Sequence, residues 1–547
     1  MNDAKEGDML CCRVAGHHHG TKRHCRVCDV SFVDMLDFDA DCTMMQPAAI
    51  DALVDNEDQA ALKELSQYCI RSCFRGFVFC NPTHGIFGAQ PGDMLHMLNL
   101  GAVKEVARLM LDCLTPSEKV KLDIMGRRFN ARLRQTHRRN FPTTDFSRGI
   151  TNTKQKTAEE YIGLLFVLCA LMNNGDAWDL IDRALKRYNL DIANVLELFE
   201  CMLCFERWCK LAAYWTKQRA IEEEQTAKDA IRLFLHHLLN TLPRDEGNGW
   251  ALSKIHELLH VPMFITWLGA PMNYHTGACE HNHKYQAKRP GRRAAKNHKT
   301  FIKSVARNIV DGHVLGVFMD LLNKHDNVLI NYEVISDQED EPVDAAQDDE
   351  GVTESNAGAT RCRICVVNNT ICAEWNSRSA VPPSLSRGLL RFIANHFGLQ
   401  QDAAKSVTLY TQYKRDDTTF RCHPNYRGGH PWFDWVMMLY SDPNHPGQQF
   451  SCPARLMAIV RDNSDPDMVY HPILQWAANR TMNDSVLFDE YVFTHNMNPD
   501  DPTSFNVHPA ESIEKPVFVI DCESENEEKV LVAHDPDVWG SLFHKIE

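Results

Sequence analysis

Residues 161–172 read YIGLLFVLCALM and form the most apolar run of the chain. These twelve residues fall short of the roughly 20 that a membrane-spanning helix needs, so we expect a buried helix and no contact with a membrane. Around this run, residues 48–324 show mostly helical spacing of apolar side chains, as in Leu95, Leu98, Val103 and Val106. The sequence therefore predicts that most of the chain is α-helical.

Length and composition describe a chain that buries a real core. The 547 residues suggest about three or four domains, or one large fold split by an insertion. Hydrophobic residues make up 44% and charged residues 24%, which excludes wholesale disorder. Nine acids and no Lys or Arg fall within residues 337–354, leaving −6 of the net charge of −15 for the rest. This local acidity predicts a disordered linker over residues 331–360 and does not exclude a nucleic-acid partner.

The pattern changes to strands after the acidic segment. Short β-branched or aromatic runs separated by Asn, Asp, Pro and Gly occur at residues 406–413, 455–460, 486–493, 516–520 and 530–533. We expect residues 361–547 to form a separate, mainly β, C-terminal domain. Met1 is followed by acidic and polar residues, so the 20 cysteines do not indicate a secreted disulfide protein and a soluble, intracellular chain is expected.

Cysteines and histidines are concentrated near the start of the chain. Cys25 and Cys28 form a CxxC pair, with Cys11 upstream, Cys42 downstream and a His run at residues 17–19 between. A CxxC pair places two thiolates at a spacing that suits tetrahedral Zn²⁺, and we predict a structural zinc knuckle with ligands Cys11, Cys25, Cys28 and Cys42. The alternative is that one CxxC occurs by chance in a cysteine-rich chain and that the His run has no ligand role.

Other cysteines give weaker signals. Cys201, Cys204 and Cys209 lie in a helical pattern, which favours buried apolar thiols. Cys362 and Cys365, with Cys372 nearby, form a second CxxC just past the acidic segment. This second pair is open to interpretation as a knuckle without clear partners or as ordinary structural cysteines.

Two further clusters combine acids and histidines. Asp93 follows Gly92 at a predicted helix start, where capping is the default role of a carboxylate, and His96 would share its helix face. An acid with a His one turn away is also able to hold a metal and orient a phosphate. His256 and His260 lie four residues apart, a spacing that admits a metal pair, although no His-Glu-x-x-His protease motif is present.

Two basic strips lie in this otherwise acidic chain. Residues 281–310 contain nine Lys or Arg and no acid, and residues 119–148 contain nine against two acids. Such strips are typical of surfaces that neutralise nucleic-acid phosphates, although a solvated helix face has the same composition.

Taken in order, these motifs resemble a known family. The order runs from Asp3, Asp8 and Cys11, with Asn2 in place of Gly, through the CxxC at 25–28, Gly85-Ile-Phe-Gly88 and Asp93-x-x-His96 with Leu100, Gly101 and Lys104, to Lys254-x-His256, His260, Gly269-Ala-Pro-Met-Asn273, Glu280 and His283-Lys284. It resembles transposase-derived proteins of diatoms and other protists, similar to the Plavaka, KDZ and CACTA-like branch of DDE transposases. The resemblance covers residues 1–324 and, more loosely, pieces near Trp432 and Pro453.

The resemblance implies a fold class of α+β, mostly α. It implies an incomplete RNase H-like α/β core with a large helical insertion, so that residues 1–47 begin the core with the zinc knuckle and residues 48–330 hold the core remnant, the insertion and a basic strip. Asp3 would be the first acid, with Asp8 as its rival, Asp93 the second with His96 beside it, and Glu280 the third. The triplet Phe205-Glu206-Arg207 is a weaker choice for the third acid because it lies in a helical stretch.

The implied activity is Mg²⁺-dependent phosphoryl transfer on DNA in the nucleus. Three carboxylates would hold two Mg²⁺ ions, for DNA cleavage and strand transfer, with self-association as a further option and no small-molecule cofactor. The following basic residues would track the DNA backbone: Lys284, Lys288, Arg289, Arg292, Arg293, Lys296 and Lys299.

Met1 stands only two residues before Asp3, where the family has an apolar strand. We therefore expect a core truncated at its N-terminus, and two readings follow: a DDE transposase, active or inactivated by that truncation, or a zinc-containing DNA-binding or chromatin-associated protein without catalysis. A third reading is an α-rich scaffold whose acidic segment and β domain bind proteins.

Overall fold

The structure is a computed structural model of the whole chain. It describes residues 8–14, 21–40, 42–74, 76, 81, 83–133, 141–144, 146, 148–154, 156–212, 215–276, 289–294, 300–324, 361–367, 370–376, 385–402, 404–415, 418–424, 432–441, 449–466, 469–476, 479–481, 485–492, 500–523 and 528–543. The predicted linker at 331–360 lies outside these residues.

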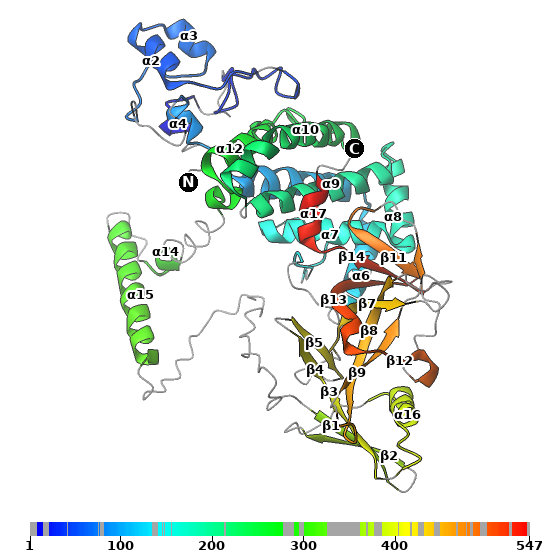
Figure 1. Cartoon of the computed structure of the whole chain (residues 1–547). Coiled ribbons are helices and arrows are strands. Elements are labelled where there is room, and N and C mark those ends of the chain that lie inside the picture. The colour runs from blue at the N-terminus through cyan, green and yellow to red at the C-terminus, as the bar shows by residue number, and fades with distance from the viewer. Residues whose placement is uncertain are drawn as a thin grey trace. The chain divides into compact units, whose positions relative to one another are not determined.

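The chain divides into two compact units, each described by itself. The described part of the smaller unit begins at Tyr274 and contains α14 (Arg289–Arg293) and α15 (Phe301–Lys324). These two helices pack together, since the Asn308 side-chain amide donates to the Pro290 carbonyl at 3.0 Å (Figure 1). The larger unit contains the remaining described elements.

The larger unit is helical up to residue 273. Its helices are α2 (Pro47–Asp55), α3 (Gln59–Glu64), α4 (Gly85–Gly88), the π-helix η1 (Leu95–Val103), α5 (Lys104–Asp112), α6 (Pro116–Leu133), α7 (Ala158–Met172), α8 (Gly175–Lys186), α9 (Ile192–Leu211), α10 (Lys217–Thr241), α11 (Ser253–His256), the 3-10 helix η3 (Glu257–His260) and α12 (Val261–Leu268). The short 3-10 helix η4 (Pro271–Tyr274) follows at the boundary with the smaller unit.

Helix α7 contains the apolar run and forms the centre of this helical region. It starts at a capping box, in which the Thr157 hydroxyl accepts from the Glu160 amide while the Glu160 carboxylate accepts from the Thr157 amide. Every residue from Tyr161 to Met172 is buried, so α7 has no solvent face and must be covered on all sides. Gly163 allows the closest of these contacts, because a Cβ there would lie 1.6 Å from the Thr143 carbonyl oxygen.

Strands occupy the C-terminal region, as predicted. They are β1 (Arg361–Val367), β2 (Thr370–Asn376), β3 (Ser406–Tyr410), β4 (Gln412–Arg415), β5 (Thr418–His423), β6 (Trp432–Phe433), β7 (Trp435–Ser441), β8 (Gln449–Asp462), β9 (Tyr470–Trp476), β10 (Asn479–Thr481), β11 (Phe488–Val492), β12 (Asn506–Val507), β13 (Ile513–Glu523) and β14 (Glu528–Ala533). The region also contains α16 (Arg387–His396), the short 3-10 helices η7 (Pro502–Ser504) and η8 (Ala510–Ser512), and α17 (Pro536–Leu542).

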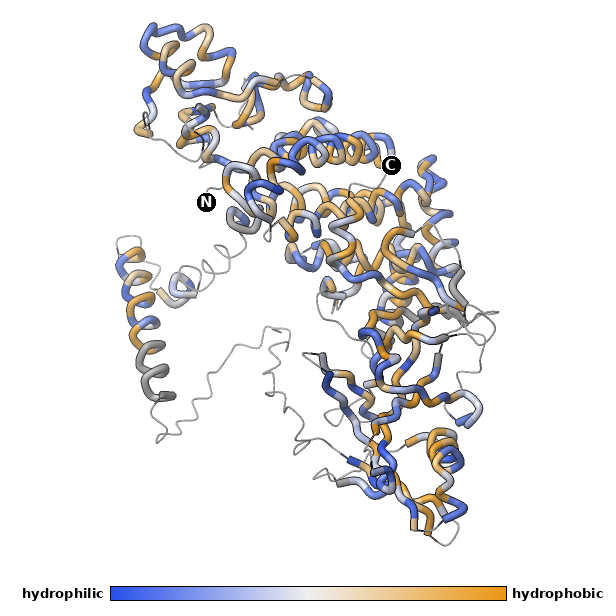
Figure 2. Tube along the Cα trace, viewed as in Figure 1, coloured by the Kyte–Doolittle hydropathy of each residue, from blue (hydrophilic) through white to orange (hydrophobic). Residues whose placement is uncertain are grey.

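One large antiparallel sheet organises these strands. Its order is β10-β11-β14-β13-β7-β8-β3-β1-β2, with β9 pairing to both β8 and β12, and β4-β5-β6 form a separate small sheet. All of the printed strand pairs are antiparallel, and β2 lies at one edge of the large sheet. Figure 2 shows apolar residues along both the central helices and the strands, matching the buried positions.

The last strands and α17 share a core with the helices. The Phe166 ring on α7 lies 5.7 Å from the Phe488 ring, 5.6 Å from Phe518 and 5.5 Å from Trp539 on α17. Figure 1 shows α17 lying against α9, in agreement with their contacts. The C-terminal region is thus mostly β, as predicted, while its end completes the helical core.

The predicted fold class is confirmed at a coarse level. The chain mixes helices and sheet, with helices before residue 325 and a mostly β C-terminal region. Within the described residues before 361, pairing is limited to isolated bridges such as Cys28 with Met44, so the strands of an RNase H-like core are not found there. Cys201, Cys204 and Cys209 are buried on α9, as expected.

No single described helix has the length and apolar composition to cross a membrane. Helices α7 and α8 would pass that test together, but they meet at a bend of 104°.

A buried carboxylate joins α9 to the C-terminal region. The Ser485 hydroxyl donates to Glu200 Oε1 at 2.6 Å, and the Val486 amide donates to Glu200 Oε2 at 3.2 Å. Burial raises the pKa of Glu200 to about 7.

This carboxylate predicts a pH-dependent stability. A folded-state pKa of about 7 against the ordinary 4.5 gives a stabilising contribution that is full below pH 4.5 and is lost as the pH rises through 7. Relative to Glu200→Gln, the wild type should lose about 2 to 3 kcal/mol of unfolding free energy between about pH 5 and pH 8. Urea unfolding at both pH values measures this difference. Glu197→Gln, an exposed position on the same helix, is the control, and parallel pH profiles for wild type and Glu200→Gln would contradict the prediction.

Candidate metal centre

The predicted CxxC pair forms a compact knuckle. The Val27 amide donates to the Cys25 sulfur at 3.4 Å, which folds the backbone around that thiol. The knuckle is held from behind, because the Met45 amide donates to the Val27 carbonyl at 2.9 Å and Cys28 bridges to Met44. Both cysteines are fully buried, although most of this segment has no helix or strand.

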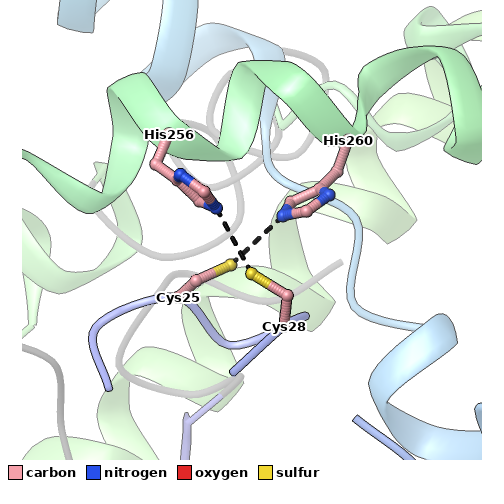
Figure 3. Close-up of side chains that lie close together, drawn as sticks. All are labelled: Cys25, Cys28, His256 and His260. Atoms are coloured by element: carbon pink, nitrogen blue, oxygen red, sulfur yellow. Dashed lines mark hydrogen bonds between the residues drawn. The ribbon is translucent and has the colours of Figure 1, made fainter. Parts of the chain in front are cut away.

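Two histidines on a helical segment face the knuckle. His256 ends α11 and His260 ends η3, just before α12 begins at Val261 with Pro262 in its first turn. Their spacing of four residues places both rings on one side of the helix, with ring centroids 5.2 Å apart. Figure 3 shows both imidazoles directed from this helix toward the two sulfurs.

The four side chains make one cluster with the geometry of a metal site. Cys25 Sγ lies 3.4 Å from His260 Nε2, and Cys28 Sγ lies 3.3 Å from His256 Nε2. All four ligand atoms lie within 4.8 Å of one another, and all four residues are buried. Tetrahedral zinc with bonds of about 2.3 Å to sulfur and 2.0 Å to nitrogen separates neighbouring ligands by about 3.5 Å. The cluster therefore fits a four-coordinate Cys₂His₂ site for a metal such as zinc.

The electrostatics of the cluster favour a cation between the sulfurs. Although burial acts to lower it, hydrogen bonding to Cys25 and Cys42 raises the pKa of His256 to about 10. Burial acts in the opposite sense on Cys25, whose pKa nevertheless lies well below its ordinary value because of hydrogen bonding to Cys28 and the nearby His260. A bound Zn²⁺ would take over the role of the shared protons and leave both thiols as thiolates.

The ligand set differs from the predicted one in two of its four members. Cys25 and Cys28 are in the cluster, whereas Cys11 packs against apolar residues including Met45 and Ile50, where burial raises its pKa to about 12. Cys42 lies beside the cluster, and hydrogen bonding to Cys28 and His256 lowers its pKa to about 5. His256 and His260 take the two remaining places.

A buried ion pair joins the same two segments. Arg26, between the two cysteines, donates from Nε to Glu257 Oε1 at 3.3 Å, and both side chains are over nine-tenths buried. Burial raises the pKa of Glu257, and the Arg26 guanidinium opposes that shift. Asp8 belongs to the same surroundings, since its carboxylate lies 3.6 Å from the buried Arg13 guanidinium. Asp8 is thus paired with a cation in the described structure.

The loop before η1 packs on this ion pair. A Cβ at Gly92 would lie 3.1 Å from Glu257 Oε2, so only glycine fits this approach without displacing a neighbour. Asp93 follows and caps η1, accepting from the Leu95 amide at 3.1 Å. Its carboxylate also contacts His96 Nδ1, as the spacing predicted, and the His96 side chain is half exposed.

Several predicted site residues fall outside the described part of the chain. These are Asp3, Glu280, Lys284, Lys288, Lys296 and Lys299, together with the side chains of Arg289 and Arg293. Arg292 is described and exposed. The alternative acid Glu206 is buried on α9 and pairs with Lys210 at 2.7 Å, which gives it a structural role.

The second CxxC does not form a knuckle. Cys362 and Cys365 lie three residues apart on β1, so their side chains point to opposite faces of the sheet. Cys362 is fully buried in the core of the β region and Cys365 is partly exposed.

Comparisons with known proteins give no assignment: no family model matches the chain, and neither a curated protein nor a solved structure is similar to it.

The two histidine ligands carried a signal that the sequence analysis did not combine. A C-x₂-C pair followed by an H-x₃-H pair is ordinary zinc-ligand spacing. Here the two pairs are separated by 227 residues, between Cys28 and His256, so each was assessed alone. Local spacing identified each half, and only the fold brings the halves together.

The metal centre predicts a specific pattern of zinc loss. The purified wild type should carry about one zinc ion per chain, and His260→Ala or Cys28→Ala should reduce this toward zero, because a three-ligand site loses affinity. Elemental analysis after dialysis measures the ratio. Cys11→Ala should retain zinc, as should His236→Ala, an exposed histidine on α10. Loss of zinc in Cys11→Ala with retention in His260→Ala would contradict the proposed ligands.

Proposed function

We propose that this chain is a transposase-derived, DNA-binding protein of the nucleus, in which a structural zinc ion fastens the N-terminal segment to the helical region. The observation that carries the proposal is the metal cluster itself. The CxxC at 25–28 and the histidines at 256 and 260 were both motifs of the family resemblance, and they meet in one buried site. Short motifs that matched by chance would have no reason to converge.

The chemistry of the cluster supports a structural role. Two sulfurs and two imidazoles complete a tetrahedral shell, so a bound zinc ion would have no open position for water or substrate. All four ligands are buried, and Arg26 and Glu257 link the same segments beside them. Zinc here would supply binding energy between two segments and no Lewis-acid chemistry.

Exposed basic residues support DNA as the partner. Lys303 and Arg307 lie four residues apart on α15 and are both exposed, as is Arg292 on α14. Residues with this spacing share a helix face, which suits contact with successive phosphates. Such contacts supply affinity and orientation without reading the base sequence.

Catalysis is a second candidate function, favoured by the Asp93 and His96 contact. On this proposal the chain keeps elements of an RNase H-like transposase core, with Asp93 as one acid, Glu280 as another and Asp3 or Asp8 as the third. Asp8 already pairs with Arg13, which makes Asp3 the better choice. Bound Mg²⁺ would supply activation of the attacking hydroxyl and stabilisation of the leaving oxygen. His96 would hold the Asp93 carboxylate in place.

DNA binding predicts an effect of charge reversal on α15. The double variant Lys303→Glu, Arg307→Glu should bind duplex DNA about tenfold more weakly, with a salt dependence lower by about two counterions, because two phosphate contacts are lost. Fluorescence anisotropy over a salt series measures both. The control variant Lys63→Glu, Lys217→Glu reverses two exposed charges elsewhere. Equal affinity for the two double variants would exclude α15 as the interface, and no binding by wild type at low salt would exclude the proposed function.

Strand cleavage separates the two candidate functions. If the chain is catalytic, wild type with Mg²⁺ should nick supercoiled plasmid, and Asp93→Ala should reduce the rate by at least about a hundredfold, as loss of a metal ligand does. Asp112→Ala on α5 removes an exposed carboxylate and serves as control. Equal background nicking by wild type and Asp93→Ala would leave the non-catalytic DNA-binding function.

A further inference from the structure

The hairpin of β1 and β2 places two cysteines directly opposite each other. In the antiparallel register, Cys365 pairs with Cys372. Paired residues of antiparallel strands point to the same face, with Cβ atoms about 4.5 to 5.5 Å apart. The Cβ separation in a disulfide is about 3.5 to 4.5 Å, so a small inward movement of the two strands is enough to bring the sulfurs into bonding range.

Both thiols are accessible to a small reagent. Cys365 and Cys372 are each partly exposed, whereas Cys362 on the opposite face is fully buried. The Cys372 thiol contacts the Thr370 carbonyl oxygen at 3.6 Å, a weak interaction that leaves the sulfur available. Neither residue belongs to the metal cluster, which is the one group of potential ligands found among the described residues.

The position of the hairpin gives the pair a structural consequence. Strand β2 is at the edge of the large sheet, and its strand partner is β1. Strand β1 is in turn paired to β3, where Cys365 lies opposite Ser406. A covalent bond between Cys365 and Cys372 would fasten the edge strand to the interior of the sheet.

We propose that Cys365 and Cys372 are a reversible oxidation site that forms a disulfide with a peroxide as oxidant. One thiolate attacks the peroxide oxygen, forming a sulfenic acid and releasing the first water. The second thiol attacks that sulfur, forming the S–S bond and releasing the second water. Two thiols and one hydrogen peroxide thus give one disulfide and two waters. Because opposed strand positions are slightly too far apart for a relaxed disulfide, the bond is strained and readily reduced by thiols.

Peptide mapping of the full chain tests this proposal directly. Trypsin cleaves after Arg363 and Arg378, so residues 364–378 form one peptide that contains both cysteines and no other. After treatment with hydrogen peroxide and alkylation, this peptide should be unalkylated and lighter by about 2 Da than its fully reduced form. Dithiothreitol before alkylation should restore two alkylated cysteines.

Variants and an internal control make the result decisive. Cys365→Ser and Cys372→Ser should each abolish the 2 Da loss and leave one alkylated cysteine, and the register predicts the same result for both. Cys69 is exposed and falls in a different peptide, so it reports whether the oxidant has acted. Two alkylated cysteines in peptide 364–378 under conditions that oxidise Cys69 would overturn the proposal. Disulfides from either cysteine to another peptide would also overturn it.

Discussion

Two thiols and two imidazoles cannot share a small buried volume unless a cation, or protons shared among them, offsets the charge of the sulfurs. That constraint explains the arrangement around Cys25, Cys28, His256 and His260. The N-terminal segment has little regular structure, and its apolar cluster is small, so it has few interactions of its own to hold a fold. A metal ion that bridges it to α11 and η3 supplies what the segment lacks. The buried pair Arg26 and Glu257 reinforces the same junction and brings the loop before Asp93 against it.

The sequence was informative wherever structure follows from local pattern. Apolar spacing identified the helices around Leu95 and Leu198, and β-branched runs identified β3, β8, β11, β13 and β14. The CxxC at 25–28 indicated two metal ligands because their spacing is fixed by the backbone. The other two ligands required knowledge of the fold, since nothing local pairs Cys28 with a histidine more than 200 residues away. Cys11 and Cys42, which are nearer in sequence, lie in apolar surroundings and beside the cluster, respectively.

The second CxxC shows how secondary structure decides what a motif means. Three-residue spacing brings two thiols together in a knuckle, whereas in a strand the same spacing sends them to opposite faces. The β-branched residues around Cys365 already favoured a strand there, so alternation alone could have excluded a knuckle. The pairing of Cys365 with Cys372 depended on the position of the hairpin turn, which the sequence suggested only weakly through its two consecutive asparagines.

The position of α17 has a consequence for the order of biosynthesis. Trp539 and Phe543 fill space between Phe166 on α7 and Phe205 on α9, although more than 300 residues separate these partners along the chain. During translation the helices emerge long before α17 does, so their apolar surfaces stay open until almost the whole polypeptide has left the ribosome. A nascent chain of this protein would therefore depend on chaperones for most of its synthesis, and a premature stop codon that removed only the last helix would leave the centre of the molecule uncovered.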